Sequence, residues 1–257
     1  MFGTFQGRDK ETMKETYNKE YSWILDRDME YAVFGESGKV MFAFAPQNGH
    51  TYDFASFGMV ETVRPWIEAG KLMVVCVDSI DAESWSDQYG DPRYRIEMQE
   101  KWFHYVTDEL APKFVSSENR GIVTGCSMGG LHAGVFFFRR PDLFDTMISL
   151  SGLFDASFFF RDYMDDLVYE NSPIHFLPNM PEDHPWMDWY SKSNIIICAG
   201  QGAWEDEMRH DAARMRDIME AKGIPGWVDF WGYDVNHDWP WWRKQLPYFV
   251  GTVLGEA

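Results

Sequence analysis

The sequence has few cysteines, no long apolar run and no obvious leader. Its three cysteines are Cys76, Cys126 and Cys198. An odd number without any CxxC spacing argues against a disulfide framework or a zinc site and favours buried free thiols. The longest apolar runs, such as residues 40–45, are far shorter than the about 20 residues that span a membrane. The N-terminal residues show no basic stretch followed by an apolar one, so we expect a cytoplasmic protein without a signal peptide.

Basic residues are also scarce. Lys and Arg number 23 against 41 Asp and Glu, which gives a formal net charge of −18. Such a chain repels phosphate backbones and anionic lipids, so we expect neither nucleic-acid nor membrane partners, and the charge otherwise serves solubility. Asp78, Asp81 and Glu83 lie close together without the His or Cys spacing of a metal site. We interpret them as a solvated loop and expect no metal.

The chain has no internal repeat, low-complexity tract or Pro/Gly/Ser linker. Its 257 residues fit one large α/β domain, residues 1–257. Residues 1–27 are polar with scattered aromatics and are interpreted as a lead-in segment. Residues 152–190 are rich in Phe, Asp, Pro and Met, and they interrupt the surrounding pattern. We expect them to form a cap-like insertion over one end of a sheet.

Short apolar runs alternate with amphipathic stretches along the rest of the chain. The runs predict strands at residues 30–34, 40–45, 72–77, 121–124, 146–150, 194–199 and 228–231. The stretches between them predict helices at residues 59–69, 96–114, 128–138, 205–222 and 241–254. Strands that are apolar throughout are covered on both faces. The pattern therefore predicts an α/β fold with a mostly parallel, doubly wound sheet and helices on both faces.

One strand runs into a G-x-S-x-G motif, Gly125-Cys-Ser127-Met128-Gly129, and a helical pattern follows. In such an elbow the serine sits on a strained turn that exposes its hydroxyl as a nucleophile. The N–H of Met128, at the helix N-terminus, can then stabilise an oxyanion. The alternative is a glycine-rich turn with an idle serine, and the position between strand and helix favours Ser127 as nucleophile. Cys126 is interpreted as a packed thiol, because centring the motif on it would put larger residues at the glycine positions.

The base should follow the serine in the sequence, with the acid between them. Only His210 and His237 lie beyond the predicted strand 194–199. His210 falls inside a predicted helix between charged neighbours, which favours a solvated side chain. His237 lies in the loop between the last strand and the last helix, where a general base is expected. The alternative is that His237 is a loop histidine whose side chain only hydrogen-bonds to the backbone.

Three carboxylates, Glu205, Asp206 and Glu207, follow the strand 194–199 and compete for the role of the acid. A carboxylate that fixes the imidazole tautomer should lie before the helix is under way, which favours Glu205 and then Asp206. Any of the three could instead simply complement the helix dipole.

The loop after the strand 40–45 usually supplies the second oxyanion donor. Here it reads Pro46-Gln47-Asn48-Gly49-His50, and we favour the backbone N–H of Gln47, with that of Asn48 next. Apolar walls are typical of ligand sites. Aromatic residues that fall near the predicted mouth are candidates for contact with substrate, and ordinary packing is the open alternative. These candidates are Trp85, Trp204 and Trp239.

The run Thr124-Gly-Cys-Ser-Met-Gly-Gly130 resembles the elbow of the “putative esterase” family of α/β-hydrolases. That family includes esterase D (S-formylglutathione hydrolase), feruloyl esterases and mycolyltransferases. The run Arg140-Pro-Asp-Leu-Phe-Asp145 resembles a second stretch of the family, and the likeness extends over about residues 28–254. It implies the α/β-hydrolase fold, a Ser–acid–His triad and no cofactor. The turn at residues 46–49 and the long segment before the acid depart from the family pattern, so the second donor and the acid stay open.

These features predict a serine carboxylic-ester hydrolase that acts on a small-molecule ester through an acyl-enzyme. An acyltransferase on the same scaffold, with an alcohol or sugar in place of water, is the first alternative. A non-catalytic binding protein is the second, and the intact serine, histidine and carboxylates argue against it. Whether the chain forms a homo-oligomer is left open.

Overall fold

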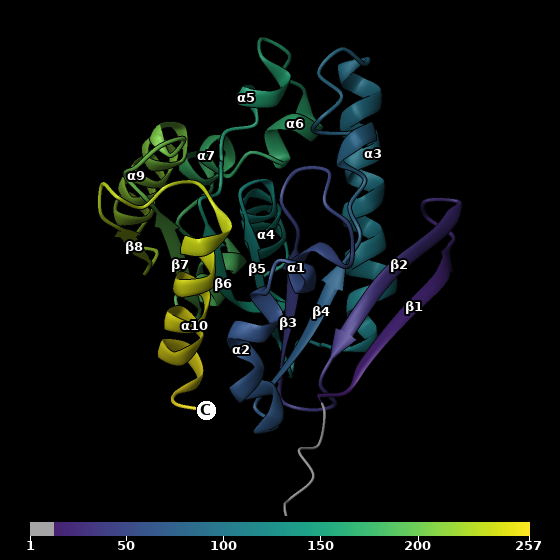
Figure 1. Cartoon of the computed structure of the whole chain (residues 1–257). Helices are drawn as coiled ribbons and strands as arrows, with labels where there is room; N and C mark the ends of the chain where they lie inside the picture. The colour runs from purple at the N-terminus through teal and green to yellow at the C-terminus, as the bar shows by residue number, and fades with distance from the viewer. Residues whose placement is uncertain (1–12) are drawn as a thin grey trace, which may run out of the picture.

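The computed structural model describes residues 13–257, which build an eight-stranded sheet in the order β1-β2-β4-β3-β5-β6-β7-β8 (Figure 1). β2 is antiparallel to both of its neighbours, and every pairing from β4 to β8 is parallel. The mostly parallel sheet predicted from the apolar runs is therefore confirmed. The strands are β1 (Glu15–Ser22), β2 (Arg27–Phe34), β3 (Lys39–Phe44), β4 (Leu72–Val77), β5 (Gly121–Cys126), β6 (Phe144–Leu150), β7 (Asn194–Ala199) and β8 (Trp227–Phe230).

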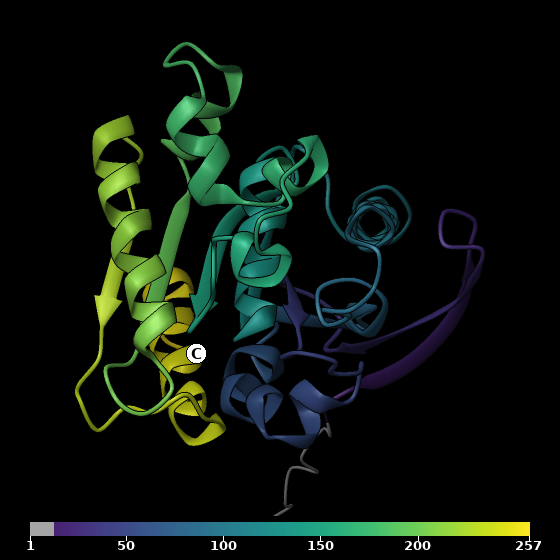
Figure 2. The ribbon, with the colours of Figure 1, turned by 90° about the horizontal axis from the view of Figure 1, so that it is seen from above.

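The interpretation of residues 1–27 as a lead-in segment is wrong for residues 15–22, which form β1. This strand pairs with β2 along its whole length and extends as a hairpin at the sheet edge (Figures 1 and 2). Seven of its eight side chains are exposed or half-buried, so it carries no apolar alternation that a sequence pattern could reveal. Its backbone hydrogen bonds hold it in place. Residues 1–12 lie outside the described part of the chain.

Helices cover both faces of the sheet (Figure 2). On one face α2 (Met59–Glu68) and α10 (Trp239–Leu254) pack against each other and against the strands. On the other face α3 (Pro92–His104), α4 (Met128–Arg139) and α9 (Asp206–Lys222) bury a larger apolar cluster. The predicted helix 96–114 begins earlier than expected because Asp91 caps it, and a π-helical turn, Tyr105–Leu110, follows it.

Residues 151–193, between β6 and β7, interrupt the strand–helix alternation with short helices. They are α5 (Ser157–Phe160), α6 (Asp166–Glu170), α7 (Pro173–Phe176) and α8 (Pro185–Tyr190), and α5 and α6 lie at the top of the molecule in Figure 1. A further short helix, α1 (Asp53–Ser56), follows β3. Within residues 13–257, none of the helices combines the length and the apolar character needed to cross a membrane.

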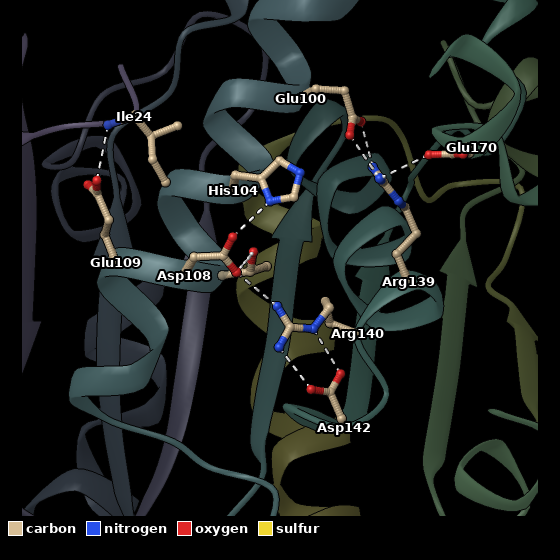
Figure 3. A network of polar contacts seen from close by, with 10 residues as sticks. Ile24, Glu100, His104, Asp108, Glu109, Arg139, Arg140, Asp142 and Glu170 are labelled. Atoms are coloured by element: carbon tan, nitrogen blue, oxygen red, sulfur yellow. Dashed lines mark hydrogen bonds and ion pairs between the residues drawn. The ribbon is translucent and has the colours of Figure 1, made fainter. Parts of the chain in front are cut away.

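An ion-pair network fastens the C-terminal end of α4 to the neighbouring helical segment (Figure 3). The guanidinium of Arg140 donates to both carboxylate oxygens of Asp142, at 2.9 and 2.8 Å, and reaches Asp108 at 3.2 Å. Next to it, Arg139 donates to both oxygens of Glu100, at 2.6 and 2.9 Å. Planar two-point contacts of this kind fix orientation as well as distance. The family-like stretch that begins at Arg140 therefore anchors α4, the helix that follows Ser127.

Candidate active site

The turn at Ser127 joins β5 to α4 in a conformation that few L-residues adopt. Ser127 has φ 57° and ψ −122°, a region that costs on the order of 1–3 kcal/mol. Two glycines make the crossing possible. A Cβ on Gly129 would lie 2.2 Å from the carbonyl oxygen of Phe44, and one on Gly125 would lie 2.3 Å from the backbone of Gly129. The G-x-S-x-G spacing is therefore a packing requirement of this elbow.

Ser127 and His237 line the same cavity, whose volume is about 360 Å³. His237 lies in the loop between β8 and α10, and its backbone N–H donates to the carbonyl of Ala203 at 3.0 Å. Its imidazole packs edge-on against Trp242, with ring centroids 5.0 Å apart, and its side chain is 15% exposed. A base in this loop is thus held by the backbone while one face of its ring stays accessible from the cavity.

The structure brings Glu205, and not Asp206, to His237. Oε1 of Glu205 lies 3.3 Å from Nδ1 of His237, and the Glu205 side chain is 1% exposed. This contact falls short of hydrogen-bond geometry, so Nδ1 of His237 is buried without a hydrogen-bond partner. Such contacts are often long before substrate binds. The Asp206 side chain is 82% exposed and pairs with Arg209 at 3.1 Å.

Two further donors bind the Glu205 carboxylate. The Ser151 hydroxyl donates to Oε1 at 2.6 Å, and the backbone N–H of Gly200 donates to Oε2 at 3.2 Å. Ser151 in turn accepts from the indole N–H of Trp242 at 3.0 Å. Sequence reasoning missed Ser151. The available signal was its position directly after β6, the strand beside the elbow strand, because parallel strands end at the same edge of the sheet.

The two candidate oxyanion segments flank Ser127. Met128 is the first residue of α4, so its N–H has no acceptor within the helix. On the other side, the Gly49 N–H donates to the carbonyl of Pro46 at 2.8 Å and closes a turn in which Asn48 has φ 58°. The Asn48 N–H donates to Oδ2 of Asp81 at 3.1 Å. Asn48 is thereby engaged, which leaves Gln47 as the better candidate of the two.

The interpretation of Asp78, Asp81 and Glu83 as a solvated loop is wrong for Asp81. This residue begins the 3-10 turn Asp81–Glu83 after β4, and its side chain is 1% exposed because the turn folds against α4. Asp78 is partly buried, and its loss of solvent raises the pKa of its carboxyl. Glu83 pairs with Arg27 near the surface. Within residues 13–257, no group of three or more His, Cys, Asp or Glu side chains could hold a metal ion.

The three predicted aromatic contacts differ in placement. Trp239 lines the cavity and stacks on Phe57, with ring centroids 4.4 Å apart and planes 2° apart. Trp85 is fully buried and packs edge-on against Phe159. Trp204 is 83% exposed and does not line the cavity. All three residues follow the carboxyl ends of strands, as their positions in the sequence predicted, but only Trp239 lines the cavity together with Ser127.

Cys126, beside the nucleophile, is fully buried, and burial raises the pKa of its thiol well above the usual value. The thiolate is the reactive form of cysteine, so this environment disfavours nucleophilic chemistry at Cys126. Burial raises the pKa of the Cys76 and Cys198 thiols as well.

Comparison with known proteins assigns the family. Residues 22–252 match the family described as Putative esterase. No curated protein sequence matches the chain significantly. Among solved structures, a ferulic acid esterase is similar with a TM-score of 0.72 and 18% identity over 94% of this chain and 97% of its own. An S-formylglutathione hydrolase from Agrobacterium tumefaciens also has a TM-score of 0.72, with 15% identity over 94% and 95%. The fluorophosphonate-binding serine hydrolase F of Staphylococcus aureus has a TM-score of 0.65, with 15% identity over 95% and 99%. The chain therefore belongs to the Putative esterase family, and it is an esterase with the α/β-hydrolase fold.

Proposed function

We propose that this esterase hydrolyses small carboxylic esters through an acyl-enzyme on Ser127, with His237 as the general base and Glu205 as the acid. The observation that carries the proposal is the shared cavity. Ser127, in its strained elbow, and His237 both face it, and the buried Glu205 lies 3.3 Å behind the imidazole. A nucleophile, a base and an orienting carboxylate in this order can move one proton and form one covalent bond at a time.

In the first half-reaction the hydroxyl oxygen of Ser127 attacks the ester carbonyl and passes its proton to Nε2 of His237. The N–H groups of Met128 and Gln47 stabilise the resulting oxyanion. The intermediate then expels the alcohol, which takes the proton from His237, and the acyl group remains on Ser127. In the second half-reaction water, activated by His237, attacks the acyl-enzyme and releases the acid.

Glu205 acts by holding the imidazole in the tautomer with its proton on Nδ1, which leaves Nε2 free to accept the proton of Ser127. Its two other contacts, from Ser151 and Gly200, fix the position of the carboxylate behind the imidazole. Phe57, Trp239 and Trp242 supply the apolar wall of the cavity. An ester with a compact apolar acyl or alcohol group suits this lining.

The test compares Ser127→Ala with Cys126→Ala in hydrolysis of p-nitrophenyl acetate. The two residues are neighbours, and only one of them is assigned to chemistry. We expect Ser127→Ala to lose activity by at least about a thousandfold, while Cys126→Ala stays within about threefold of wild type. Full activity in a folded Ser127→Ala variant would overturn the proposal. Added alcohol acceptors, with the ester products measured, distinguish hydrolysis from acyl transfer.

A further inference from the structure

A buried acid–imidazole pair lies beside the active site and has no part in the proposed mechanism. Oδ1 of Asp81 lies 2.8 Å from Nε2 of His132, and both side chains are 1% exposed. His132 is on α4, the helix that begins directly after Ser127. Asp81 comes from the turn after β4. The pair therefore links the elbow helix to the loop after β4, a strand that is separated from the elbow strand β5 by β3.

The second carboxylate oxygen of Asp81 contacts the predicted oxyanion turn, residues 46–49. Oδ2 accepts the backbone N–H of Asn48 at 3.1 Å. Asn48 has φ 58°, a conformation that a non-glycine residue keeps only when its surroundings hold it. A second contact joins the same two loops, because the side-chain amide of Gln47 donates to the hydroxyl of Ser86 at 2.9 Å. The turn that carries the Gln47 N–H is thus fastened to the loop of Asp81.

The surroundings of His132 favour one tautomer of its imidazole. Its ring packs among Trp102, Phe44 and Trp85, at centroid distances of 4.7, 6.1 and 6.4 Å. Nδ1 of His132 is buried without a hydrogen-bond partner. A bare nitrogen lone pair there is less costly than an unpaired N–H, so the neutral imidazole carries its proton on Nε2 and donates it to Asp81. Both oxygens of the buried carboxylate then receive a donor.

We propose that Asp81 is a positioning residue for the oxyanion hole, fixed by His132, and that it holds the turn 46–49 so that the Gln47 N–H meets the ester carbonyl oxygen. This inference rests on the proposed function. An oxyanion donor matters most in the transition state, where the charge develops. Loss of the Asp81 contact should therefore lower kcat and leave KM nearly unchanged.

The first test is a variant series measured by steady-state kinetics per folded active site. Asp81→Ala should lower kcat by about ten- to a hundredfold, less than or equal to the loss of one oxyanion donor, with KM within about threefold. Asp81→Asn keeps an acceptor for the Asn48 N–H and can donate to His132 after the imidazole proton moves to Nδ1. Asp81→Asn should restore kcat to within about fivefold of wild type and lower stability, because the N–H at Nδ1 of His132 is then buried without a partner. If Asp81→Ala does not fold, Asp81→Thr keeps the volume near that of aspartate and shortens the polar arm.

Asp78→Ala is the matched control. Asp78 also follows β4, and it accepts the Thr51 N–H at 3.2 Å and contacts His50 at 3.3 Å, beyond the oxyanion turn. The Asp78→Ala variant should therefore keep kcat within about threefold of wild type.

The second test separates positioning from a purely structural role. A trifluoromethyl ketone forms a charged tetrahedral adduct with an active serine, and the matching secondary alcohol binds without forming one. Asp81→Ala should weaken the ketone by the same factor as kcat/KM and leave alcohol binding unchanged. Equal kcat in Asp81→Ala and wild type, or equal loss of ketone and alcohol binding, would overturn the inference. If instead the wild-type protein binds the ketone no better than Ser127→Ala does, the proposed function itself fails.

Discussion

The Glu205→Gln substitution is the most informative single change, because an amide cannot satisfy all three contacts of this carboxylate. Oε1 accepts from Ser151 and faces Nδ1 of His237, while Oε2 accepts from the Gly200 N–H. If the amide oxygen keeps the Oε1 position, its NH2 group meets the Gly200 N–H. If the amide is flipped, its NH2 group faces Nδ1 and favours the tautomer whose Nε2 carries a proton and cannot accept that of Ser127.

Both orientations have a calculable consequence. The flipped amide resembles the aspartate-to-asparagine change in a serine protease triad, which lowers turnover by about 10⁴. The unflipped amide leaves a buried donor unpaired, which costs about 1–3 kcal/mol of stability. We expect kcat for p-nitrophenyl acetate to fall by at least about a hundredfold, equivalent to about 2.7 kcal/mol of transition-state stabilisation. We also expect a Tm lowered by a few degrees, at about 2–4 °C per kcal/mol.

Asp206→Asn is the matched control, because this neighbouring carboxylate is 82% exposed. It should stay within about threefold of wild type in kcat and change the free energy of unfolding by no more than about 1 kcal/mol. A Glu205→Gln variant with normal kcat, or an Asp206→Asn variant that is the slower of the two, would refute the assignment of the acid.

Three further changes test the surroundings of the site. Gln47→Pro should keep the turn, because a positive φ at the third position of a turn suits proline at the second, but it deletes the Gln47 N–H, so kcat should fall about a hundredfold. Gln47→Ala keeps the N–H and the Asp81 contact and loses only the side-chain contact to Ser86, so its kcat should fall by no more than about fivefold. Ser151→Ala removes a donor to the charged acid and should lower kcat about tenfold, with retention of full kcat counting against its orienting role. The three cysteine thiols should be unreactive toward Ellman's reagent in the native protein and react on denaturation, because burial raises their pKa. Rapid native labelling accompanied by loss of activity would contradict that last expectation.

The parts of the fold that could be predicted from the sequence are those with local causes. The parallel strands are mostly apolar, and β4 is apolar throughout, because helices cover both faces of the sheet. The elbow at Ser127 needs glycines at fixed spacing. β1 was missed because its side chains face solvent on both sides and only backbone pairing with β2 holds it. No pattern within one strand reports that kind of stabilisation.

The direction in which a side chain points, and its partners far away in the sequence, were harder to predict than the place of the residue in the fold. Glu205 and Asp206 are adjacent, but Glu205 precedes α9 while Asp206 is its first residue, and their side chains point in different directions, so one is buried and the other is exposed. Trp85 falls near the site along the chain but turns into the core. The Asp81–His132 contact joins residues 51 positions apart on different elements, and nothing in either local sequence signals the other. Such pairs emerge only from the packed structure.

Covalent labelling of the native protein with a fluorophosphonate, followed by intact-mass measurement and peptide mapping, tests the central claim most directly. The proposed mechanism predicts one adduct per chain, located on Ser127, with loss of esterase activity in proportion to labelling and no adduct in Ser127→Ala. An adduct on any other residue, or labelling of folded Ser127→Ala at the wild-type rate, would contradict Ser127 as the nucleophile.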